Sequence, residues 1–178
     1  MRTAAALILI CGVAPGQEPS RPSTVVVLPS AMRDSMSAIW TVNNRHWDWV
    51  PNGNTPADLQ GFSAPTHRYL GCLTGSPAGD TLWLRHFVPA AGVKPRQLEV
   101  TGDCSNVAGF IGTWHTHPYR AGFERRAIKE RGLSGRDLKA FAAASDLVMI
   151  AVWDVDSLDL AVKGPEGGVR YPVSYIVR

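Results

Sequence analysis

Hydrophobic residues recur at strand-like spacing along most of the chain and at helical spacing in two places. The β-branched run TVVVLP predicts a strand at 24–29 that ends at proline. In the following stretch, SAMRDSMSAIW, the apolar residues fall on one face of a helix, so a helix is predicted over 30–40 with Ser30 as its N-cap. The methionines of this stretch are expected in the core rather than at a ligand.

The second half of the chain contains most of the predicted strands. LVMIAVWD is nearly continuous in its hydrophobicity, which is typical of a strand buried on both faces. A helix is predicted over 134–144, and SPAG after Gly75 favours a hairpin. The predicted strands occupy 67–75, 80–89, 107–115, 147–154, 159–164 and 169–177. Strands mixed with two to three helices predict an α/β single domain built on one mixed β-sheet.

The remaining long segment, 41–66, is dense in Asn, Pro and Gly and has no sustained period. A loop of this length inside a compact domain tends to be functional or disordered. Trp47 and Trp49 within it either form a substrate-contacting wall or fold back over the core, and the sequence does not separate these two interpretations.

The N-terminal residues predict a leader followed by a linker, residues 1–22, before a folded domain at 23–178. MRTAAALILICGVAPGQ resembles a secretory signal peptide, which would place the protein in the periplasm or outside the cell; a misplaced start codon or a disordered tail would leave it in the cytoplasm. In an exported chain, Cys72 and Cys104 could pair, and Cys11 would leave with the leader. The apolar run is too short to span a bilayer.

Composition narrows the function classes only slightly. With 178 residues, 45% hydrophobic and 19% charged, the chain is long and apolar enough to bury a core. Its net charge of +3 is too small to indicate a nucleic-acid partner. The cysteines form neither a CxxC pair nor a zinc-finger spacing, so a metal site would have to use histidine and carboxylate.

Two histidines stand one residue apart in GFIGTWHTHPYR, where an apolar strand reaches a proline. Residues i and i+2 of a strand share a face, so His115 and His117 are expected to converge on one point. The helix predicted after them begins with Ser134 and carries Asp137 three residues later. That pair is either a capping box or, in the case of Asp137, a third metal ligand; by itself it favours the cap.

The combination of these motifs resembles the JAMM (JAB/MPN+) metallopeptidase family. The shared pattern is H-T-H-P at 115–118 and S-x-x-D at 134–137, followed by the apolar strand LVMIAVWD. The resemblance covers about residues 23–163 and implies a JAMM/MPN-like fold and a zinc-dependent peptidase or isopeptidase with a peptide or protein substrate. It implies His115, His117 and Asp137 as zinc ligands and Ser134 as the residue that steadies the polarised carbonyl.

Two features depart from the family. The connector at 119–133 is longer than usual and basic, which predicts a charged helix that either faces solvent or faces substrate. The family's general-base glutamate is replaced by Arg68, which stays protonated and so cannot act as a base. Arg68 could instead contact a substrate carboxylate or oxyanion.

The candidates for a substitute base are His67, Asp58 and the connector carboxylates Glu124 and Glu130, with none favoured. Two functions therefore follow from the sequence. The first is a zinc-dependent hydrolase with an unusually placed base, and the alternative is a non-catalytic JAMM-like binding module. A purely structural domain is the third and weakest interpretation.

Overall fold

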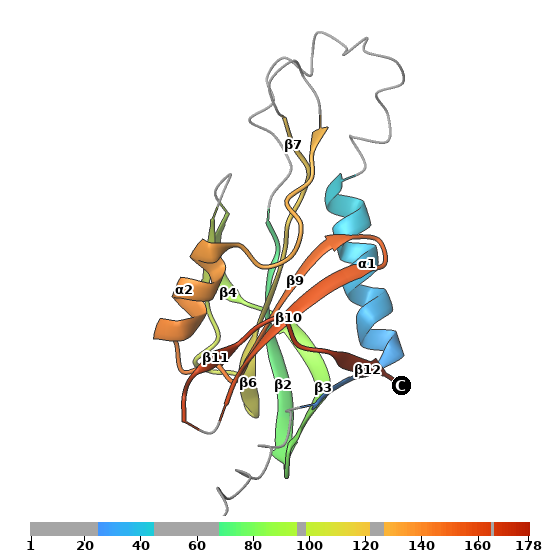
Figure 1. Ribbon diagram of the computed structural model, residues 1–178. Coiled ribbons are helices and arrows are strands. Elements are labelled where there is room, and N and C mark those ends of the chain that lie inside the picture. The colour runs from blue at the N-terminus through green and yellow to red at the C-terminus, as the bar shows by residue number, and fades with distance from the viewer. Residues whose placement is uncertain (1–24, 45–67, 96–98, 122–126, 165) are drawn as a thin grey trace, which may run out of the picture.

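An eight-stranded mixed sheet forms the centre of the molecule, in a computed structural model that describes residues 25–44, 68–95, 99–121, 127–164 and 166–178 (Figure 1). The sheet is curled, and one domain with two helices is built around it. In spatial order its strands are β11 (Val169–Arg170), β10 (Ser157–Lys163), β9 (Val148–Asp154), β6 (Phe110–Thr116), β2 (Leu70–Ala78), β3 (Thr81–Pro89), β1 (Val25–Leu28) and β12 (Tyr175–Val177).

Helix α1 (Ser30–Asn44) covers one face of this sheet and closes the main core. Met32, Met36 and Trp40 are buried on it at helical spacing, as the sequence predicts. On β9, Val148, Ile150 and Val152 belong to the same cluster. The alternate residues of β9 point to the other face, so both faces of this strand are buried.

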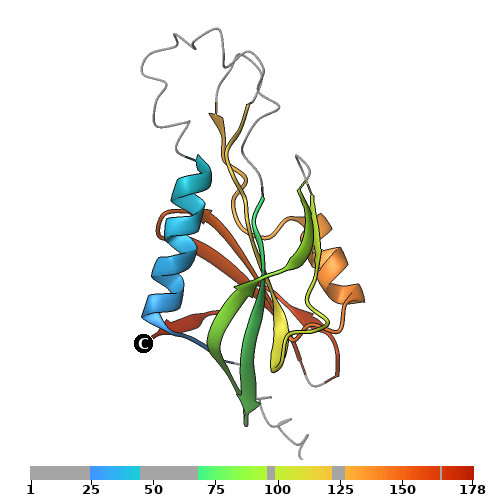
Figure 2. The ribbon, with the colours of Figure 1, turned by 180° about the vertical axis from the view of Figure 1, so that it is seen from behind.

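Helix α2 (Gly135–Ala143) lies on the opposite side of the sheet from α1 (Figures 1 and 2). Its Phe141 is fully buried against Met149 and Ala151 of β9, and Leu133 and Ala161 complete this second, smaller cluster. Strand β9, which lies between the two helices, therefore carries residues of both cores.

A hairpin outside the main sheet stands beside α2 (Figure 2). It consists of β4 (Ala91–Pro95) and β5 (Val100–Asp103), which pair only with each other among the described strands. A disulfide joins Cys72 of β2 to Cys104, the residue directly after β5. The hairpin is thus covalently fastened to the sheet.

Most predicted elements are confirmed, with shifts at their ends. The helix predicted over 30–40 continues to Asn44, and Ser30 is its first residue rather than its N-cap, because the amide of Arg33 donates to the carbonyl of Pro29. Residues 41–44 were thus wrongly included in the predicted loop, and the rest of that loop lies outside the described residues.

The prediction of a helix in the connector is wrong for the residues that the structure describes. They instead form a short antiparallel pair, β7 (Arg120–Ala121) and β8 (Ala127–Ile128). The segment predicted as one strand at 169–177 is two strands, β11 and β12, at opposite edges of the sheet. None of the described helices is long and apolar enough to span a membrane.

Candidate metal centre

The histidine pair lies at the end of β6, in the middle of the sheet. His115 is opposite Leu70 of β2 on one side and Ala151 of β9 on the other. Since Trp114 belongs to the core under α1, its neighbour His115 points to the opposite face, toward α2. Both imidazoles are buried, with His115 4% exposed and His117 0% exposed.

Backbone hydrogen bonds hold His117 although it lies just past the strand. Its amide donates to the carbonyl of Val152 at 2.8 Å. Its carbonyl accepts a hydrogen bond from the indole Nε1 of Trp40, on α1, at 3.1 Å. Helix α1 and strand β9 therefore fix the backbone on which the second histidine is carried.

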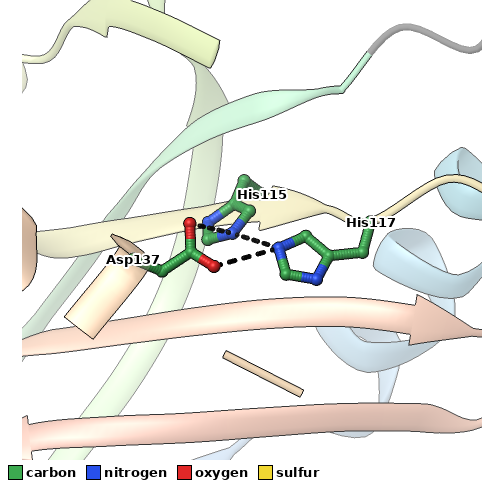
Figure 3. A group of neighbouring side chains, drawn as sticks. All are labelled: His115, His117 and Asp137. Carbon is green, nitrogen blue, oxygen red and sulfur yellow. Dashed lines mark hydrogen bonds and ion pairs between the residues drawn. The ribbon is translucent and has the colours of Figure 1, made fainter. Parts of the chain in front are cut away.

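Asp137 completes the group from the first turn of α2, and the three side chains point toward one another (Figure 3). The Nε2 atoms of His115 and His117 are 2.9 Å apart. Asp137 Oδ1 lies 3.5 Å from His115 Nε2, and its Oδ2 lies 3.3 Å from His117 Nε2. Within the described part of the chain, this is the group of histidine, cysteine and carboxylate side chains whose spacing could hold a metal ion.

These separations are short enough for the three side chains to share one metal ion. Donor atoms about 2.0–2.1 Å from zinc at the tetrahedral angle are about 3.3 Å from one another. The two Nε2 atoms are 2.9 Å apart, and they lie 3.5 and 3.3 Å from different oxygens of Asp137, so one donor atom from each residue lies within 4.8 Å of the others. Two histidines with one carboxylate are also a donor set typical of catalytic zinc.

The electrostatics of the group favour the protonation states that bind cations. Burial lowers the pKa of His115, and this effect outweighs the attraction of Asp137. Burial by itself would raise the pKa of Asp137, but the nitrogens of His115 and His117 outweigh it and hold the pKa well below its usual range. A neutral imidazole beside an ionised carboxylate is what a metal requires of its ligands.

Ser134 caps α2 and orients Asp137 at the same time. Its Oγ accepts a hydrogen bond from the amide of Asp137 at 3.2 Å, and Asp137 Oδ2 accepts one from the amide of Ser134 at 2.8 Å, which is a capping box. The Ser134 hydroxyl also donates to Asp137 Oδ2 at 2.6 Å. The capping and ligand interpretations of S-x-x-D are therefore both compatible with this geometry.

Arg68 lies at the rim of the group, and the connector supplies its partner. Its Nη2 donates to Oε2 of Glu130 at 2.7 Å, and its Nη1 lies 3.9 Å from Asp137 Oδ1. The neighbouring Lys129 forms an ion pair with Asp154 at the end of β9 and lies over the ring of Trp153. The basic connector is thus tied to the sheet beside the histidines.

A groove of about 510 Å³ runs from this group along α2. Its walls are the hairpin strand β5 and helix α2, and Thr113, His115 and Met149 contribute to its floor. Asp146 lies in the groove and accepts a hydrogen bond from Thr113 at 3.0 Å. Burial raises the pKa of Asp146.

The structure brings together the main predicted site residues, His115, His117, Asp137, Ser134 and Arg68. The other predicted contacts and bases lie outside the described residues: Trp47, Trp49, Asp58, His67 and Glu124.

Two features of the site were not found from the sequence. One is the ion pair between Arg68 and Glu130, which are 62 positions apart. The other is the groove wall from β5, a segment with no alternating pattern. The two glutamates in the basic connector, Glu124 and Glu130, were the available signal for the ion pair, but they did not indicate a partner.

No protein-family model matches this chain, and no curated protein matches it either. The structure shows a mixed α/β fold with a buried His-His-Asp group that could hold a metal ion.

Proposed function

We propose that this chain is a zinc-dependent hydrolase of JAMM type, acting on an amide or isopeptide bond of a peptide or protein. The observation that carries the proposal is the convergence of His115, His117 and Asp137, whose donor atoms lie close enough together to share one ion. The zinc ligands would be these three side chains. When bound, such an ion supplies Lewis-acid activation of water and of a carbonyl oxygen.

The groove supports a peptide as the substrate class. Its volume of about 510 Å³ is in the range of specific ligand sites. Residues 100–102 of β5 line it, and β5 pairs with β4 alone among the described strands. An extended peptide could therefore pair with the β5 backbone while its scissile bond lies over His115 and Asp137.

The first test is the metal content of the purified protein after dialysis, measured by elemental analysis. We expect about one zinc per chain in the wild type and in Asp146→Asn, which changes a groove carboxylate outside the group. His117→Ala and Asp137→Asn are expected to lose the ion. Wild-type protein that takes up no zinc, even when zinc is supplied, would refute the proposed site.

The second test is hydrolysis of a library of internally quenched peptides together with an isopeptide-linked lysine substrate. We expect cleavage that a chelator abolishes and added zinc restores. Stoichiometric zinc with no cleavage of either probe would overturn the hydrolase proposal in favour of the JAMM-like binding module, which the arginine at position 68 also suits.

A further inference from the structure

The pairing of β2 with β6 continues past the end of β2 and places Arg68 beside the histidines. The amide of Tyr69 donates to Thr116 Oγ1 at 2.9 Å, and its carbonyl accepts from the amide of Thr116 at 3.1 Å. Arg68, the preceding residue, therefore enters the same face as the histidine pair. Its side chain is only 3% exposed and forms part of the groove lining.

Glu130 fixes how this guanidinium is presented. Arg68 Nη2 donates a hydrogen bond to Glu130 at 2.7 Å. The other terminal nitrogen of the guanidinium, Nη1, lies 3.9 Å from Asp137 Oδ1. Lys129 forms an ion pair with Asp154 and lies over the rings of Tyr119 and Trp153. These contacts hold the connector segment that carries Glu130. The buried guanidinium of Arg68 is thus held in one orientation beside His115, His117 and Asp137.

The hydroxyl of Ser134, the carbonyl donor that the resemblance implies, is engaged with Asp137 in this geometry. A serine hydroxyl has a single hydrogen to donate. In the structure that hydrogen goes to Asp137 Oδ2 at 2.6 Å, while the same oxygen caps α2. A donor for a carbonyl oxygen over the group must then come from another residue.

Resting on the proposed hydrolysis, we propose that Arg68 is a catalytic residue whose Nη1 arm donates a hydrogen bond to the scissile carbonyl oxygen as negative charge develops on it. In the reaction, the oxygen of water bonds to the carbonyl carbon and the C–N bond breaks. The two products are a carboxylate and an amine that has taken up the water protons. Arg68 keeps its own protons throughout, and Glu130 is a positioning residue that acts through it.

The surroundings of Arg68 favour this role over capture of a substrate carboxylate. Glu130 and Asp137 already place two carboxylates around the guanidinium, at 2.7 and 3.9 Å. A third full negative charge in the same buried space would be repelled by both. A carbonyl oxygen is neutral on binding and gains charge only as the reaction proceeds, so the interaction strengthens in the transition state.

The test compares Arg68→Met, Arg68→Lys and Arg68→Ala with the wild type, using the best substrate of the peptide assay. We expect about one zinc in each variant and a kcat that falls about 100-fold or more in Arg68→Met, with KM changed less than about threefold. Glu130→Gln is expected to lower kcat by a smaller factor. Arg33→Met, which removes an exposed arginine paired with Asp34 on α1, is the matched control and should retain wild-type kinetics.

Chemical rescue separates a donor from a structural support. Methylguanidine added to Arg68→Ala should restore part of the lost kcat, whereas sodium chloride at equal conductivity should not. A phosphinic peptide that mimics the tetrahedral state should bind Arg68→Met more weakly by calorimetry, in proportion to the loss in kcat/KM.

The two proposals fail in different ways. A wild-type enzyme that cleaves peptides, together with an Arg68→Met variant that keeps zinc and retains kcat within threefold, would overturn the role of Arg68 alone. Loss of zinc in step with activity in both Arg68→Met and Arg68→Lys would also overturn it, because Arg68 would then support the metal site. A wild-type protein that binds zinc and cleaves nothing would overturn the hydrolase proposal, and the role of Arg68 with it.

Discussion

The Cys72–Cys104 disulfide makes a quantitative prediction about stability. It joins residues 32 positions apart, with Cα atoms 5.6 Å from each other. Closing a loop of this length in the unfolded chain removes about 12.5 cal/mol/K of entropy, or about 3.7 kcal/mol at 25 °C. For a chain of this size, each kcal/mol corresponds to roughly 2–4 °C in Tm, so reduction is expected to lower Tm by about 7–15 °C.

The loss of stability on reduction should be concentrated in the elements that form the groove. Cys72 is fully buried in β2, and Cys104 directly follows β5, which forms one wall. Because β4 is exposed along its whole length, the hairpin has few other apolar contacts with which to hold its place. Reduced protein should therefore exchange the amide hydrogens of residues 100–103 faster than those of β9.

The assay is differential scanning calorimetry of oxidised protein and of protein reduced with a phosphine, both in chelator so that metal binding cannot contribute. The Cys104→Ser variant removes the disulfide without a reductant and leaves the fully buried Cys72 unchanged. Peptide mapping under non-reducing conditions establishes the bond beforehand. If oxidised and reduced protein melt within about 2 °C of each other while the bond is present, the loop-closure reasoning is wrong.

Two further predictions concern Gly112 of β6 and the buried carboxylate of the groove, Asp146. Gly112→Ala would place a Cβ 1.9 Å from the carbonyl oxygen of Val148, a backbone atom that cannot rotate away. We therefore expect the free energy of unfolding in urea to fall by about 3 kcal/mol or more. The control is Gly135→Ala, whose added Cβ would meet nothing within 4 Å and should change this free energy by at most about 1 kcal/mol. Burial raises the pKa of Asp146 above its usual 3.8. Its contribution to the free energy of unfolding is therefore complete below pH 3.8 and is lost as the pH rises through the pKa that Asp146 has in the folded protein. Urea midpoints of wild type and Asp146→Asn should therefore diverge in favour of the variant from pH 3.5 to 7, and a difference that is independent of pH would contradict this.

The elements that could be predicted from the sequence are those with a local apolar pattern, either a continuous buried run or a helical period. TVVVLP, the methionine-bearing helix and LVMIAVWD are confirmed because each places its apolar residues against a core at the spacing of its own geometry. The end of α1 was placed too early, at Trp40, because Thr41–Asn44 are weak helix formers. The helix nevertheless continues, and Thr41 Oγ1 donates back to the carbonyl of Ser37 at 2.8 Å.

The hairpin β4–β5 was missed for the opposite reason. AGVKP is exposed at every position, and VTGD is exposed at all but one, so neither has an alternating pattern. What holds this hairpin is a covalent bond between residues far apart in sequence, together with close packing of Gly102 against Ala90 and Leu70. No local pattern predicts such contacts.

The same contrast explains the candidate site. The histidines converge because strand alternation is a local rule, and it acts between residues two apart. The meeting of Arg68 and Glu130 depends on where a non-periodic connector crosses the sheet, whereas its charges predicted a helix that faces solvent or substrate. Local chemistry therefore indicated the metal group, whereas the partner of Arg68 required the fold.

The geometry of Ser134 and Asp137 shows that a helix cap and a metal ligand are compatible roles for the same carboxylate. A carboxylate has two oxygens: Asp137 Oδ2 receives both hydrogen bonds from Ser134 and lies 3.3 Å from His117 Nε2, while Oδ1 lies 3.5 Å from His115 Nε2. The capping box fixes the rotamer of the same side chain that faces the histidines. It thereby removes conformational freedom that Asp137 would otherwise lose on binding a cation, so a strong cap at this position favours a preformed ligand.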